Sequence, residues 1–79
     1  MELEKQLREE IKKWSSKLDA NLSSARPIGE KGVEFLTNIK AYQSDSLHFM
    51  EKKDLVRSFE ALIWAWSWME IGRQMEILS

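Results

Sequence analysis

The stretch that decides the fold is DLVRSFEALIWAWSWMEIGRQMEI, residues 54–77. At about 100° per residue, its polar side chains fall on one narrow strip of a helix. The members of this strip are Glu60, Ser67, Glu70 and Gln74. We therefore predict a helix over 55–77, with the Asp54 carboxylate accepting free backbone N–H groups at its N-cap.

The opposite side of this helix is a seam of mostly small side chains, which lets neighbouring backbones approach closely. Its members are Ser58, Ala61, Leu62, Ala65, Met69 and Gly72. Trp64 and Trp68 flank the seam on one side, and Phe59 and Trp66 flank it on the other. The apolar arc covers roughly two-thirds of the circumference, wider than the ~100° that a surface helix buries. Either two neighbouring helices enclose this helix, or part of its arc is free.

The part of the arc that two neighbours would leave free lies beside the polar strip. Val56 and Ile63 extend the Phe59 and Trp66 flank there, and these four residues form our candidate exposed patch. A large apolar patch on a folded domain usually marks an interaction surface. We expect Trp66 at the surface. We expect the other tryptophans to fill the core: Trp14, Trp64 and Trp68.

Two more helices precede this one, separated by the breaker segment 26–32, which contains Pro27, Gly29 and Gly32. Before the breaker, an apolar stripe with steps of three and four predicts an amphipathic helix over 2–25. The stripe consists of Leu3, Leu7, Ile11, Trp14, Leu18, Leu22 and Ala25. After it, a second apolar face predicts a helix over 30–52. This face consists of Phe35, Leu36, Ile39, Tyr42, Ser46, Phe49 and Met50.

The connections are short, which makes neighbouring helices antiparallel. We predict an all-α, antiparallel three-helix bundle (up-down-up) that forms one domain, residues 1–79. A hairpin centred near Lys53 places Tyr42 opposite Trp64. It also brings Asp45, at the margin of the apolar face, near Arg57. We predict a structural Asp45–Arg57 ion pair, with a hydrogen bond from Asp45 to a neighbouring helix as the alternative.

Composition excludes several classes of protein. Charged residues make up 32% of the chain, yet the net charge is −1, which argues against a dedicated nucleic-acid binder. The chain contains no cysteine, so disulfides and thiolate metal sites are excluded. The longest apolar run, residues 61–66, is far short of the roughly 20 needed to cross a bilayer. The first ten residues do not resemble a signal peptide. We expect a cytoplasmic protein without membrane contact.

Candidate catalytic chemistry is scarce. The only histidine, His48, falls on the polar face of the predicted second helix, and a metal site needs several convergent ligands. Gly29 and Gly32 lack the Lys-Ser/Thr of a phosphate loop. One histidine on a polar face also gives no Ser–His–Asp arrangement. We therefore expect no enzyme activity, no cofactor and no metal.

The second half of the chain resembles an archaeal family of short helical proteins known only as a domain of unknown function. The segments that carry the resemblance are Ala-Tyr-x-Ser-Asp at 41–45, Asp-x-Val-Arg-Ser-Phe at 54–59, and Trp-Ala-x-Ser-Trp-Met-Glu at 64–70, with Phe49 between the first two. The departures from the family pattern are Trp64 for Tyr, Trp66 for His, Ser67 for Gly and Glu70 for Asp. The resemblance implies a three-helix bundle of spectrin-repeat-like topology and an archaeal source, and it implies no activity.

Two functions remain open from the sequence. The first is a structural or interaction module that uses the helix over 55–77, either by self-association as a homodimer or by docking onto a larger protein. The alternative is an accessory factor in RNA or DNA handling, which predicts salt-sensitive binding. The basic residues available for it are Lys12, Lys13, Lys17, Lys52, Lys53 and Arg57.

Overall fold

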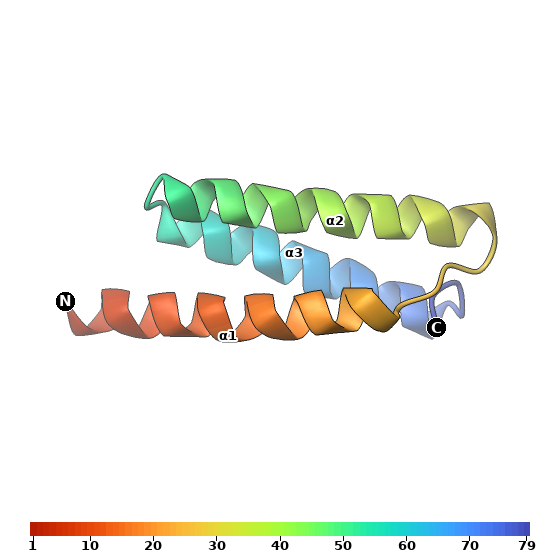
Figure 1. The fold of residues 1–79 in the computed structure, drawn as a ribbon, viewed down its shortest axis with the longest axis horizontal. Coiled ribbons are helices and arrows are strands. Elements are labelled where there is room, and N and C mark those ends of the chain that lie inside the picture. The colour runs from red at the N-terminus through yellow and green to blue at the C-terminus, as the bar shows by residue number, and fades with distance from the viewer.

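The computed structural model describes residues Met1–Ser79 and contains three helices (Figure 1): α1 (Glu2–Ser24), α2 (Gly29–Glu51) and α3 (Leu55–Gln74). They run up-down-up in a rod of 45 × 17 × 17 Å. The predicted all-α three-helix bundle is confirmed. The bounds of α1 and α2 lie within one residue of those predicted, but α3 ends three residues early.

The centre of the bundle is α3, which packs against both α2 and α1. Its predicted seam is buried along its whole length, and Ser58 and Ala65 have no exposed surface at all. Around the seam, α1 contributes Ile11 and Leu18 to the core. The contribution of α2 to the same core includes Phe35 and Ile39.

A pair of buried serines joins α2 to α3. The Ser46 hydroxyl donates to the Ser58 carbonyl at 2.8 Å, and the Ser58 hydroxyl donates to the Ser46 carbonyl at 2.8 Å. Both side chains are therefore satisfied at a point where the helix backbones come close. In the same hairpin the Tyr42 ring stacks on Trp64 with 6.2 Å between centroids, as predicted.

The predicted Asp45–Arg57 ion pair is wrong. The Arg57 guanidinium lies 2.9 Å from the Asp54 carboxylate, while Asp45 is exposed and has no ion-pair partner. The physical reason is register and proximity: Ser46, one residue later, occupies the position that faces α3. Asp54 is three residues from Arg57 on the same helical turn. Their pairing therefore costs less conformational entropy than a pairing between two helices would. The Arg57 backbone N–H also donates to Asp54, which confirms the predicted N-cap.

The prediction that α3 continues to Ile77 is also wrong. The chain reverses at Glu76, whose φ is 60°, and the Gly72 carbonyl accepts the N–H groups of Ile77 and Leu78 at 3.0 and 3.2 Å. The Leu78 side chain is then buried in the core. A helix continued to Ile77 would leave this leucine in water, so its burial favours the reversal.

The reversed tail closes the end of the bundle against the α1–α2 linker. Ile28 donates its N–H to the Ile77 carbonyl at 2.8 Å, and Ser79 donates to the Arg26 carbonyl at 3.0 Å. Gly32 lies against this tail, and a Cβ there would collide with the Ile77 carbonyl. The position of the tail thus requires a glycine at position 32.

Two of the tryptophans predicted for the core are more exposed than expected. Trp64 is 53% exposed, although its ring stacks on that of Tyr42. Trp14 lies at the edge of α1 and is also exposed. Trp68 does pack against the core, with its ring 4.7 Å from that of Phe35 and nearly perpendicular to it. None of the three helices is long and apolar enough to span a membrane.

Candidate interaction groove

An open apolar groove of about 340 Å³ runs between α1 and α3. Its lining consists of Trp14, Phe59, Leu62, Ile63, Trp66, Ser67 and Glu70. One of these residues comes from α1 and six come from α3. The groove therefore lies on the side of α3 where the sequence predicts an apolar surplus.

Two tryptophans, one from each helix, line the groove. The rings of Trp14 and Trp66 meet edge to face, with centroids 5.7 Å apart. The Trp66 indole N–H donates to the Trp14 carbonyl at 3.2 Å, and the Trp14 indole N–H donates to Glu10 at 3.0 Å. Both polar ring atoms are thus satisfied within the chain, which leaves apolar ring surface to face the groove.

The four residues of the candidate patch differ in exposure. Val56 is 71% exposed and Ile63 is 50% exposed, whereas Phe59 and Trp66 are half-buried against the core. Each is separated from the next by three or four positions along α3, so they form one continuous stripe. Their role in binding a partner stays a prediction.

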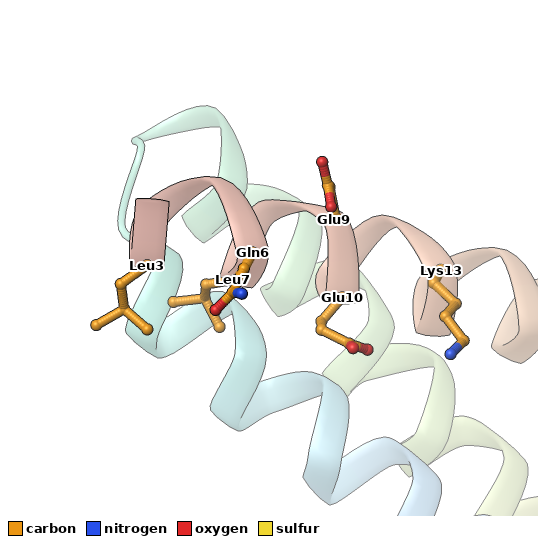
Figure 2. A pocket seen from close by; sticks show the side chains of 6 residues that line it. All are labelled: Leu3, Gln6, Leu7, Glu9, Glu10 and Lys13. Carbon is orange, nitrogen blue, oxygen red and sulfur yellow. The ribbon is translucent and has the colours of Figure 1, made fainter. Parts of the chain in front are cut away.

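The apolar surface continues onto the first turns of α1. A wide hollow there, about 640 Å³, is lined by Leu3, Gln6, Leu7, Glu9, Glu10 and Lys13. In Figure 2, Leu3 and Leu7 project from the same side of α1, and Glu9 points away from them. Leu3 is mostly exposed, whereas Leu7 is half-buried against the core. Figure 1 shows that α1 and α3 diverge towards the N-terminus of α1.

A third hollow connects these first turns of α1 with the start of α3. Its lining includes Leu3 and Leu7 from α1 and Val56 from α3, together with Lys52 and Lys53 from the turn between α2 and α3. We use the term α1–α3 face for the whole apolar surface: Leu3, Leu7, Trp14, Val56, Phe59, Ile63 and Trp66. The sequence alone assigned Leu3 and Leu7 to one packed stripe, which is confirmed for Leu7 but not for Leu3. The period cannot separate the two, because a stripe has the same period whether its helix packs or diverges.

Several of the basic residues named for nucleic-acid binding already have a partner within the chain. The ammonium groups of Lys13 and Lys17 lie 5.5 and 4.6 Å from the centroid of the Trp14 ring. At such distances a cation is attracted by the ring. Arg57 is held by Asp54.

The candidate chemical groups are separate from the groove. His48 is exposed on α2, with its ring beside that of Phe49. No group of three histidine, cysteine, aspartate or glutamate side chains lies close enough together to hold a metal ion. The pKa of Asp54 is lowered, chiefly because the backbone N–H of Arg57 donates to its carboxylate. That carboxylate serves as a helix cap.

Comparison with known proteins settles the family. The sequence model described as "Protein of unknown function (DUF357)" matches residues 5–78. The chain belongs to the DUF357 family. The resemblance seen in the second half of the sequence is thereby confirmed, and it extends over nearly the whole chain.

A solved DUF357 structure, protein AF1782 from Archaeoglobus fulgidus, is 44% identical, with a TM-score of 0.86. The alignment covers 98% of this chain and 96% of that one. No curated protein matches. DUF357 membership therefore establishes the fold and assigns no activity.

Proposed function

We propose that this protein is a non-catalytic interaction module that binds a protein partner through its α1–α3 face. The observation that carries the proposal is the exposure of Val56 and Ile63, 71% and 50%, on a helix whose opposite side is already fully packed. Large contiguous apolar patches on folded domains usually mark interaction sites.

The composition and rigidity of the face also support protein binding. Tryptophan is among the residues that contribute most to binding free energy at interfaces. Trp14 and Trp66 are held by each other and by their indole hydrogen bonds. A side chain already fixed by its own chain loses little conformational entropy when a partner covers it.

A cytoplasmic location in an archaeal cell stays a prediction. The relative from Archaeoglobus fulgidus supports the archaeal part of it. The absence of enzyme activity is likewise part of the proposal.

Site-specific photo-crosslinking in a native or related host tests the proposed function. A benzophenone amino acid replaces Ile63 in one variant and Leu47 in the other. The two positions are similarly exposed, 50% and 55%, but Leu47 lies on α2 and lines a different hollow, with Ser15 and Ser16 of α1. We expect a crosslinked protein adduct from position 63 and none from position 47. Adducts from neither position, or equal adducts from both, would contradict the proposal.

A further inference from the structure

We infer that the partner on the α1–α3 face is a second copy of this chain, docked by the same face with the two α3 helices antiparallel. This inference rests on the proposed function and names its partner. Three observations carry it: the spacing of the patch, the charges at its two ends, and the size of the face.

The spacing of the patch is symmetric. Along α3 the steps from Val56 to Phe59, Ile63 and Trp66 are three, four and three, so the stripe reads the same in both directions about the level of Ala61. A two-fold axis at that level places Val56 of one copy opposite Trp66 of the other, and Phe59 opposite Ile63. Such a self-complementary pairing is what an isologous dimer requires.

The two-fold axis also places the most exposed residue of each patch against the groove of the other copy. Val56 is the most exposed residue of the patch, and Trp66 lines the groove that also contains Trp14. On a helix with a rise of about 1.5 Å per residue, Val56 and Trp66 each lie about 7.5 Å from the level of Ala61. In the antiparallel dimer each Val56 side chain therefore enters the groove of the other copy.

Charges at the two ends of the patch select the antiparallel orientation. Glu70 lies beside Trp66 in the groove, whereas Lys52 and Lys53 share a hollow with Val56. The two acids that also line this hollow are already paired within the chain, Glu4 with Arg8 and Asp54 with Arg57. An antiparallel copy brings each Glu70 towards the two lysines of its partner. A parallel copy would instead bring Glu70 to Glu70, and like charges in contact are unfavourable.

The charges on α1 run in the opposite order along the rod. Glu2 and Glu4 lie in its first turn, and Lys13 and Lys17 lie about three turns later, over the Trp14 ring. α1 runs parallel to α3, with Trp14 at the level of Trp66. The antiparallel dimer therefore also sets the acidic start of each α1 near the basic segment of the other.

The rod is large enough for a dimer of this kind when the partner covers one whole long side. That side measures 45 by 17 Å. This is close to the ~800 Å² that each partner buries in a protein–protein interface of standard size. A short chain buries a smaller fraction of its surface on folding than a longer chain does. Burying further apolar surface in a dimer therefore adds a proportionally larger stabilisation.

Sedimentation equilibrium of the purified full chain over a wide concentration range tests the inference. We expect the mass to rise to twice that of one chain. Ile63→Glu should abolish this rise at unchanged helix content by circular dichroism, because it would bury a charge at the interface. Leu47→Glu, the matched control at a similarly exposed site, should leave the dimer intact. A wild-type chain that stays monomeric throughout would overturn the inference.

Charge reversal tests the orientation. Glu70→Lys should raise the dimer Kd about tenfold at low salt, because each contact occurs twice. Adding Lys52→Glu and Lys53→Glu to the same chain should restore the wild-type Kd, and high salt should reduce both effects. A dimer that the added substitutions do not restore would overturn the antiparallel arrangement.

The two experiments distinguish this inference from the proposed function. A monomer in sedimentation, together with a crosslink from position 63 to a different protein, would overturn the second copy and leave the proposed function standing. A monomer without any crosslink from position 63 would overturn both.

Discussion

Asp54 determines where α3 begins. Its carboxylate accepts the Arg57 backbone N–H at 3.1 Å and lies 2.9 Å from the Arg57 guanidinium. The pKa of this carboxyl is lowered from its ordinary value, first by the backbone hydrogen bond and then by the side chain of Arg57. Because the residue is at the surface, solvent screens the charge part of this interaction.

The lowered pKa predicts a pH-dependent contribution of Asp54 to stability. The folded state binds this proton less tightly than the unfolded state does, so the contribution is present above the unfolded pKa and is lost as the pH falls through the folded one. Asp54→Asn keeps an N-cap acceptor but removes the titration. We expect the urea midpoint of the wild type to exceed that of the variant near neutral pH, and the gap to close below about pH 4. A gap that does not change with pH would contradict the assignment.

The sequence pattern predicts that Ser46 and Ser58 face the core, but it does not predict the hydrogen bonds between them. Each is a polar residue at a core-facing position of its own helix, and the sequence places both there correctly. That they bond to each other follows from the register of α2 against α3. The same register displaced Asp45 from the interface and made the predicted pair with Arg57 wrong.

At the scale of elements, the reversed C-terminal tail stabilises one end of the bundle. It buries Leu78 between the helices and bonds to the α1–α2 linker through Ile77 and Ser79. Leu78 also touches the end of α3: a Cβ at Gly72 would lie 2.5 Å from the Leu78 Cδ1. The tail thus contacts both the α1–α2 linker and the end of α3.

We predict that Leu78→Ala lowers the free energy of unfolding by about 2–3 kcal/mol, because it removes a buried leucine and leaves a cavity. Met75→Ala, in the same tail but half exposed, should change it by less than about 0.5 kcal/mol. Denaturant unfolding followed by circular dichroism measures both. Equal effects from the two substitutions would show that the tail is not part of the core.

At the scale of the whole molecule, the bundle is not uniformly packed. α3 is buried along its seam, whereas in α1 only Ile11 and Leu18 are fully buried and Leu3 is mostly exposed. Local opening requires less free energy where fewer apolar contacts must break. We therefore expect the first half of α1 to open more readily than α3.

Native-state hydrogen exchange should reveal this gradient. At low protein concentration, where association is weakest, we expect the amides of residues 5–10 to exchange faster than those of residues 62–69 in α3. The same α1 amides should slow as the concentration rises, because the second copy covers them. Protection of α1 equal to that of α3 at low concentration would contradict the gradient.

The sequence by itself determined the three helices, two of their lengths, the N-cap of α3 and the seam that is buried. These depend on side-chain periodicity and on local breakers, which act within a few residues. Only the tertiary structure decided how far α1 follows α3, which polar residues meet across α2 and α3, and that the tail turns back at Glu76. Those features arise from contacts between residues distant along the chain, such as Ile77 with Ile28 and Trp66 with Trp14. Their free energies depend on the relative placement of whole helices, which no local period encodes.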